Sequence, residues 1–184
     1  MKKSFLFNGK GGQGTIFISI ILAKSAILSN LYAIQTQHYS AAQRGDIVKS
    51  LVIVSDEEIF YPKIQEVDFF ISYDLKAFLN FRNYINEKSL IIYDNSYEDL
   101  NEDFKNNNIF KLPLTKYSIE NFKTKELANV ISLGFLSNFL DFINIENFYK
   151  VFDNLEKGDK TLNKEAFDFG RNLKVPIKKG GSHV

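Results

Sequence analysis

The stretch Asn8-Gly-Lys-Gly-Gly-Gln-Gly14 lies between the apolar run Phe5–Phe7 and a longer apolar run from Ile16 to Leu28. This order predicts a strand, a glycine turn and the start of a helix within the first thirty residues. The four glycines of the turn allow positive φ and a close approach of backbone N–H groups to another chain or to an anionic ligand. A tight turn without any ligand fits the glycines equally well.

Two nucleotide-binding fingerprints match this stretch in part. Gly9-Lys10-Gly11 followed by Gly14 has the Rossmann spacing, but the expected ribose-binding carboxylate is absent from Leu31–Ser40. The glycines also have P-loop spacing, but Thr15 stands where that motif needs a lysine. Leu90–Asp94 resembles a Walker B strand, although apolar strands often end in Asp without a metal. A stand-alone P-loop or Rossmann nucleotide-binding protein is the alternative function, and NTP hydrolysis is disfavoured.

Composition excludes several kinds of site. The 184 residues include no cysteine, which rules out a disulfide framework, a cysteine nucleophile and thiolate ligation of zinc or an iron–sulfur cluster by this chain. With only two histidines, a multi-histidine metal site is not available. The net charge of +1 gives no strong field, so we expect neither nucleic acid nor membrane as a partner.

The chain is predicted to be a cytoplasmic protein with one main domain. No signal peptide is recognisable before the glycine turn, and the run Ile16–Leu28 is too short and too polar to span a bilayer. We expect a single domain over residues 1–175 and a flexible tail over residues 176–184.

Hydrophobic periodicity predicts strands that alternate with helices. The expected strands cover residues 4–7, 31–36, 47–55, 68–73, 89–93 and 109–114, and the expected helices cover 15–29, 76–85, 125–142, 146–155 and 162–173. The segment 97–108 is expected to be a loop or a frayed helix. This pattern predicts an α/β fold with a mostly parallel, Rossmann-like sheet flanked by helices and a helical C-terminal third.

Two loops are expected to meet at one edge of the sheet, because ligands of open α/β sheets bind at the carboxyl ends of the strands. One is the glycine turn, and the other is the polar segment Gln37–Asp46. Arg44 can bind a carboxylate or a phosphate, and Tyr39 can supply a flat face and a hydroxyl. An exposed loop in which Arg44 pairs with Asp46 or Asp56 is the plainer interpretation.

An ordered set of short motifs runs along nearly the whole chain. In sequence order these are Gly9–Gly14, Gln35–Tyr39 with Arg44-Gly45, Val48–Ser50, Val54–Ile59, Tyr61-Pro62, Asp68 and Ala128–Gly134. With these motifs the chain resembles the gamma subunit of 2-oxoacid:ferredoxin oxidoreductases. The spacing around Gln35, Tyr39 and the stretch Ser55–Pro62 is most similar to the separate gamma chain of the 2-oxoglutarate enzymes.

The resemblance implies CoA-dependent oxidative decarboxylation of a 2-oxo acid to an acyl-CoA and carbon dioxide, with two electrons passed to ferredoxin. It implies alpha and beta subunits that bind thiamine diphosphate and Mg²⁺, and a ferredoxin-like delta subunit. Iron–sulfur clusters of the 4Fe-4S type would also belong to partner subunits. No catalytic residue, no metal ligand and no cofactor bound by this chain alone is expected, and coenzyme A is the co-substrate.

The glycine edge is expected to pack against the thiamine-binding subunits and to shape the path of coenzyme A. Lys10 and Arg44 are the cationic candidates for phosphate contacts, and a pure docking role is the competing hypothesis. We also expect Phe60 and Tyr61 to belong to a partner interface. The candidate binding residues are Gly9, Lys10, Gly11, Gly12, Gln13, Gly14, Tyr39 and Arg44.

Overall fold

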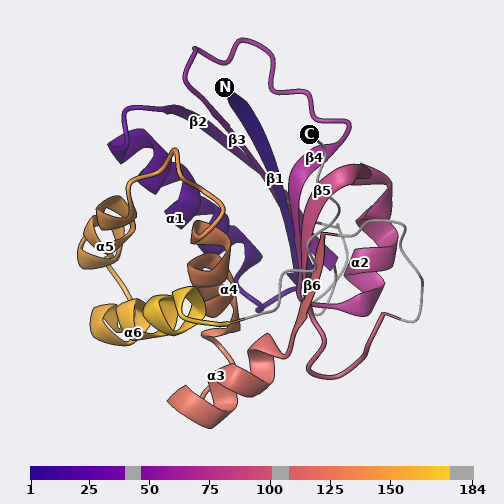
Figure 1. The fold of residues 1–184 in the computed structure, drawn as a ribbon, viewed down its shortest axis with the longest axis vertical. Helices are drawn as coiled ribbons and strands as arrows, with labels where there is room; N and C mark the ends of the chain where they lie inside the picture. Colours follow the sequence, from indigo (N-terminus) through magenta and orange to yellow (C-terminus); the bar gives the residue numbers. More distant parts are fainter. Residues whose placement is uncertain (40–46, 101–107, 175–184) are drawn as a thin grey trace, which may run out of the picture.

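The computed structural model describes residues 1–39, 47–100 and 108–174, and it contains a six-stranded sheet with helices on both faces (Figure 1). The strand order is β2-β3-β1-β4-β5-β6. The strands are β1 (Lys2–Lys10), β2 (Tyr32–Tyr39), β3 (Ile47–Ser55), β4 (Val67–Ser72), β5 (Ile85–Asp94) and β6 (Ile109–Leu112). The helices are α1 (Thr15–Leu28), α2 (Leu75–Phe81), the 3₁₀ turn η1 (Arg82–Tyr84), α3 (Leu114–Phe122), α4 (Ala128–Ser137), α5 (Ile145–Asp153) and α6 (Lys160–Arg171).

The sheet is mostly parallel, as the sequence predicts, and β3 is the exception. β3 pairs antiparallel with both β1 and β2, whereas β1, β4, β5 and β6 pair in parallel along the sheet. Its apolar run Leu51–Val54 is buried on both faces, because Val52 and Val54 pack in the cluster that includes α1 and Leu51 packs in the cluster that includes Phe78 of α2. Burial on both faces explains why this strand reads as a continuous run rather than an alternating one.

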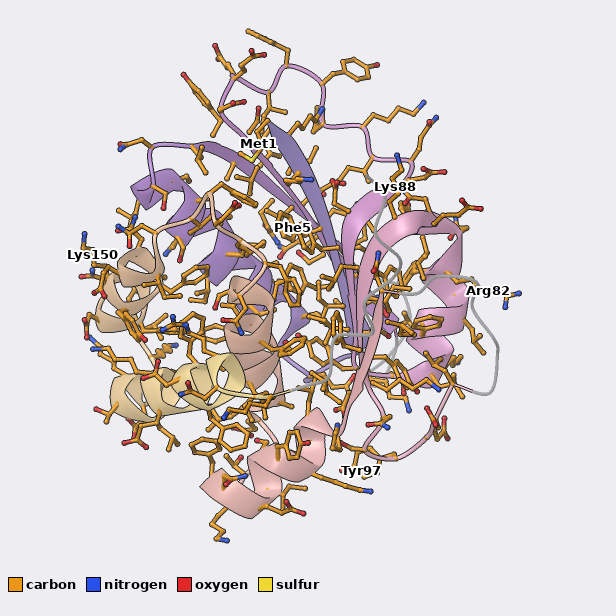
Figure 2. All side chains as sticks on the ribbon, in the orientation of Figure 1. Met1, Phe5, Arg82, Lys88, Tyr97 and Lys150 are labelled. Carbon is orange, nitrogen blue, oxygen red and sulfur yellow. The ribbon has the colours of Figure 1, made fainter. Side chains whose placement is uncertain are left out.

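One face of the sheet is covered by α1, α4, α5 and α6, and the other by α2 (Figure 1). Phe5 of β1 lies in the core between the sheet and the larger helical layer (Figure 2). Two polar residues within apolar segments are explained by mutual hydrogen bonds. Ser19 of α1 and Ser50 of β3 have their hydroxyl oxygens 2.7 Å apart, and Gln35 Nε2 donates to Ser50 Oγ at 2.7 Å.

Two helices differ substantially from the sequence prediction, and one helix was not predicted. The helix expected over residues 76–85 divides into α2 and η1, since Ile85 already belongs to β5. The helix expected over residues 125–142 is shorter in the structure, where α4 covers only Ala128–Ser137. The helix α3 was missed, because Pro113 ends the strand and the following residues form hydrogen bonds to distant parts of the chain.

The C-terminal helical layer is held together by two glycines. An added Cβ at Gly134 of α4 would lie 2.0 Å from the carbonyl oxygen of Phe167, and one at Gly170 of α6 would lie 2.0 Å from that of Ile131. The backbones of the two helices therefore touch at both positions. No helix within the three described ranges is long and apolar enough to cross a membrane.

Gly134→Ala should lower the free energy of unfolding by about 1–3 kcal/mol, because α4 and α6 must separate to admit the methyl group. This loss exceeds the helix-propensity gain of roughly 1 kcal/mol that alanine brings over glycine. Urea denaturation of the purified chain measures the change. Glu165→Ala, at an exposed position of α6, is the control and should change stability by less than about 0.5 kcal/mol. A Gly134→Ala protein as stable as the control would contradict the packing described.

Candidate functional site

The glycine turn lies at the carboxyl ends of the parallel strands. β1 continues to Lys10, so Gly9 and Lys10 are strand residues and the turn itself is Gly11–Gly14. Val48 of β3 pairs with Gly9 on one side and with Tyr39 on the other. The backbone at Tyr39 is therefore two strand spacings, about 10 Å, from Gly9 at the same edge.

This register confirms that β2 and the glycine turn reach one edge of the sheet. The backbone of Tyr39 ends β2 there. Arg44, the other candidate of the second loop, lies outside the described residues.

Gln13 closes the turn and ties it to β4. Its Oε1 accepts from the backbone N–H of Lys10 at 2.5 Å, and its Nε2 donates to the carbonyl oxygen of Tyr73 at 2.9 Å. Its own backbone N–H donates to the Lys10 carbonyl at 3.1 Å. An added Cβ at Gly9 would lie 2.5 Å from Gln13 Oε1. Gly9 and Gln13 are thus explained by the construction of the turn itself.

Gly14 joins the turn to a segment more than one hundred residues away. It has φ of 75° and forms the N-cap of α1 without any side-chain cap. An added Cβ would lie 1.7 Å from Asn129 Nδ2, which donates to the carbonyl oxygen of Gln13 at 3.3 Å. Gly12 also has a positive φ, 94°, but a Cβ there would meet nothing within 4 Å. Gly14 is therefore limited by both conformation and space, and Gly12 by conformation alone.

Lys10 is engaged in an ion pair. Its Nζ lies 2.7 Å from Asp74 Oδ2, and Asp74 Oδ1 also caps α2 by accepting from the backbone N–H of Ala77 at 3.1 Å. The hydrogen bond to Asp74, aided by its charge, raises the pKa of Lys10. The lysine side chain is 53% exposed. It stays cationic, but Asp74 offsets much of the charge that it could offer to a ligand.

A cavity of about 450 Å³ opens beside the turn. Its lining comes from five separated segments of the chain: Lys10, Gly11, Gly12, Gln13, Tyr73, Tyr97, Thr115, Lys125, Glu126 and Ala128. Tyr97 is 75% exposed and lies at the edge of the molecule opposite Met1 (Figure 2). Lys125 is exposed and has no ion pair with any residue that the structure describes. Sequence reasoning missed Tyr73, Tyr97, Thr115, Lys125 and Glu126, since no local motif connects them.

The cavity has two cationic lining residues, Lys10 and Lys125, and one carboxylate, Glu126, so the glycine backbone decides how well it receives an anionic group. Gly11 and Gly12 bring backbone into its wall, and the start of α1 carries the positive end of the helix dipole. Its volume lies in the range of small-molecule pockets. Acid–base chemistry by Tyr73 is disfavoured, because burial raises the pKa of this tyrosine and its hydroxyl is 2.6 Å from Ser132 Oγ. Over the described ranges there is no cluster of three or more potential metal ligands.

Asp94 is the residue that gave β5 its Walker B appearance, and its carboxylate is already hydrogen-bonded within the protein. Its carboxylate accepts from the backbone N–H and hydroxyl of Ser96, and from the backbone N–H and hydroxyl of Thr115 at the start of α3. Thr15, at the position of the P-loop lysine, is buried. The hydrogen bonds of Asp94 and the burial of Thr15 give no support to nucleotide hydrolysis.

Comparison with known proteins gives a match along nearly the whole chain. Residues 4–173 match the family model described as pyruvate ferredoxin/flavodoxin oxidoreductase. The 2-oxoglutarate synthase subunit KorC of Methanocaldococcus jannaschii is 32% identical over 176 residues, which is 92% of each chain. The subunit of the same name from Methanothermobacter marburgensis is 32% identical over 181 residues, 94% of this chain and 97% of the relative.

Two solved structures share the fold. The gamma subunit of a keto/oxoacid ferredoxin oxidoreductase from Geobacter sulfurreducens superposes with a TM-score of 0.78 at 22% identity, covering 92% of this chain and 94% of that one. The 2-oxoglutarate:ferredoxin oxidoreductase from Magnetococcus marinus, solved with 2-oxoglutarate, coenzyme A and succinyl-CoA bound, gives a TM-score of 0.81 at 22% identity. It covers 92% of this chain and 30% of that longer one.

The two positive-φ glycines of the turn should differ in their tolerance of alanine. Gly12→Ala should cost about 1–2 kcal/mol of unfolding free energy, from left-handed backbone strain alone. Gly14→Ala should cost at least about 1 kcal/mol more, since its methyl group overlaps Asn129 and overpacking adds its own penalty. Urea denaturation of the two variants measures the difference. Equal losses would show that Asn129 does not fill the space beside Gly14.

Proposed function

Because the chain belongs to the pyruvate ferredoxin/flavodoxin oxidoreductase family, we propose that it is the gamma subunit of a 2-oxoglutarate:ferredoxin oxidoreductase. The complex would convert 2-oxoglutarate and coenzyme A to succinyl-CoA and carbon dioxide, and pass two electrons to ferredoxin, with the cytoplasm as its expected location. The observation that carries the substrate choice is the set of relatives called 2-oxoglutarate synthase subunits, which align over more than nine tenths of this chain.

The redox and decarboxylation chemistry is assigned to partner subunits. The chain has no cysteine, so it has no thiolate to hold an iron–sulfur cluster. The proposal therefore gives thiamine diphosphate and Mg²⁺ to the alpha and beta subunits and the clusters to a ferredoxin-like delta subunit. Thiamine diphosphate would supply the carbanion-stabilising chemistry that decarboxylation of a 2-oxo acid requires. This chain would contribute shape and charge at the edge of that site.

We assign the cavity beside the glycine turn to the path of coenzyme A. Its anion-attracting features are the turn backbone, which leads into α1, and Lys125, while Glu126 in the same lining opposes them. Tyr39 and Arg44 of the second loop are proposed to complete it. An anion at a helix N-terminus gains only about 0.3–1 kcal/mol at an exposed site. A dissociation constant of about 1 mM already requires about 4 kcal/mol. The site is therefore proposed as shared, with the thiamine-binding subunits supplying most of the affinity.

The substrate assignment is tested on the complex purified anaerobically from its host through a tag on this chain. We expect CoA-dependent reduction of a viologen dye, with kcat/KM for 2-oxoglutarate at least about tenfold above that for pyruvate, a preference of about 1.4 kcal/mol. A preference for pyruvate would contradict the substrate choice. A chain that purifies without other subunits or activity would contradict the subunit role and favour the nucleotide-binding alternative.

The CoA path is tested by removing its cations within the assembled complex. Lys125→Gln, and separately the double variant Lys10→Gln/Arg44→Gln, should raise KM for coenzyme A about three- to tenfold and leave kcat nearly unchanged, the change expected for about 0.7–1.4 kcal/mol of lost binding. Lys24→Gln, at an exposed position in the C-terminal half of α1, is the matched control. An unchanged KM in both site variants would favour a pure docking role for the glycine edge.

A further inference from the structure

The connection between β3 and β4 carries the most exposed aromatic side chains that the structure describes. Phe60 is 83% exposed and Tyr61 is 77% exposed. The connection projects from the amino-terminal edge of the sheet, at the end opposite the glycine turn (Figure 1). Scattered exposed apolar residues are ordinary, but two adjacent aromatic rings on a projecting segment mark an interaction surface.

Both ends of this connection are fixed to the body of the protein. At its start, the backbone N–H of Asp56 donates to the carbonyl oxygen of Met1 at 3.2 Å. At its end, Glu66 accepts from Asn86 Nδ2 at 3.1 Å. Between these points Ile64 packs against the apolar cluster under α2. The aromatic rings are therefore presented on a short span between fixed positions rather than on a long free loop.

A fixed span reduces the entropy lost on binding. Pro62 follows Tyr61 directly, so the backbone of Tyr61 and of Pro62 itself is restricted. Phenylalanine and tyrosine each have only two side-chain torsions to immobilise, and each can bury 150–250 Å² of surface. Binding energy at interfaces is concentrated in such aromatic anchors when they enter a pocket that excludes water. Phe60 and Tyr61 have the properties of such anchors.

The charged residues beside Phe60 and Tyr61 indicate what kind of surface these rings bind. The segment Asp56–Glu66 contains four carboxylates and one lysine. Asp56 pairs with the amino group of Met1 at 2.6 Å, and Glu66 is bound by Asn86. The carboxylates of Glu57 and Glu58 form no hydrogen bond or ion pair with residues of the described part of the chain. Glu57 and Glu58 thus stand just before the aromatic pair with only Ile59 between, and Lys63, which has no ion pair within the described residues, follows Pro62. The segment around the rings therefore keeps a net negative charge.

We infer that Phe60 and Tyr61 insert into an apolar pocket with a lysine- or arginine-bearing rim on a different subunit of the oxidoreductase complex. The inference rests on the proposed function, which supplies the other subunits. The charges of Glu57 and Glu58 would orient the encounter, because rim charges mainly govern association rate and salt dependence.

A second copy of the chain is the competing occupant. A groove of about 250 Å³ lies between α1 and α5 and also combines apolar and basic side chains. It is lined by Lys24, Ile27, Leu28, Lys150, Val151 and Asn154. If the aromatic segment of one copy entered this groove on another copy, two unlike surfaces of the same chain would meet. Such a contact gives a finite assembly only when the copies close into a ring or a two-fold dimer, and an open filament otherwise. Binding to a different subunit does not require the copies of this chain to close into a ring or dimer.

The test measures binding of this chain to the sub-complex of the remaining subunits, purified without it. Phe60→Ala/Tyr61→Ala should weaken binding at least about 30-fold, the loss typical of a truncated hot spot. Tyr32→Ala, an exposed tyrosine on β2, is the control and should leave the affinity unchanged. Thermal unfolding of the isolated chain should show both variants folded as the unaltered chain, since their side chains are exposed.

Charge reversal tests the basic rim separately. Glu57→Lys/Glu58→Lys should slow association at low ionic strength and remove the salt dependence that the unaltered chain shows between about 0.05 and about 0.5 M salt. Glu165→Lys on α6 is the matched charge control. Surface plasmon resonance at both salt concentrations gives the rates directly.

The outcomes distinguish failure of the proposed function from failure of the docking inference. If the unaltered chain does not bind the sub-complex, the proposed function is overturned, and this inference with it. If the unaltered chain binds and Phe60→Ala/Tyr61→Ala binds equally well, the inference alone is overturned. If the isolated chain self-associates, and both this variant and Lys24→Glu/Lys150→Glu abolish that association, the occupant is a second copy and the inference is likewise overturned.

Discussion

The contact between Gly14 and Asn129 connects the two halves of the molecule. The Asn129 side chain occupies the space where a Cβ of residue 14 would lie, and it donates to the carbonyl oxygen of Gln13. The glycine turn therefore sits directly against the start of α4. Further along α4, Gly134 contacts the backbone of Phe167, so α6 packs directly against α4. The first contact thus fixes the start of α4 against the glycine turn, and the second fixes α6 against α4.

The same contact gives the cavity its shape. The wall that faces the turn is formed by Lys125, Glu126 and Ala128, which immediately precede Asn129. A side chain at residue 14 would displace this wall from the turn. The glycine motif near the amino terminus and the Asn129 segment thus share one structural purpose, although 116 residues separate Gln13 from Asn129. Their joint presence in the chain has a physical basis that neither segment shows alone.

The fold class and strand set could be predicted from hydrophobic periodicity, because buried strands such as Leu51–Val54 leave a plain apolar signal. The reversed direction of β3 could not, since a strand buried on both faces looks the same in either direction. The helix α3 was missed because its start depends on Asp94, twenty-one residues before Thr115. The cavity lining escaped prediction for the same reason, as Tyr97 and Lys125 meet the turn only through the fold.

Carboxylates at this edge of the sheet are used for construction rather than for chemistry. Asp74 follows β4, caps α2 and holds Lys10, and Asp94 ends β5 and holds the start of α3. Within the described residues these acids do not belong to any group of three or more potential metal ligands, and Glu126 is the carboxylate that lines the cavity itself. What the edge offers is backbone N–H groups, a helix start and Lys125. Such a surface can hold an anion in place while other groups do the chemistry, which is the division of labour proposed for a gamma subunit.

The sheet end at the glycine turn and the aromatic segment with Phe60 and Tyr61 lie far apart. β1 has nine residues, so the two ends of the sheet are about 30 Å apart. A single small ligand at the glycine edge therefore does not reach Phe60 and Tyr61, and the two surfaces require separate occupants. The parallel strands between them form a rigid connection with few ways to deform. A subunit held at its far end by aromatic anchors would present its glycine edge to the ligand path in one fixed orientation, so docking at one end and ligand positioning at the other become parts of the same function.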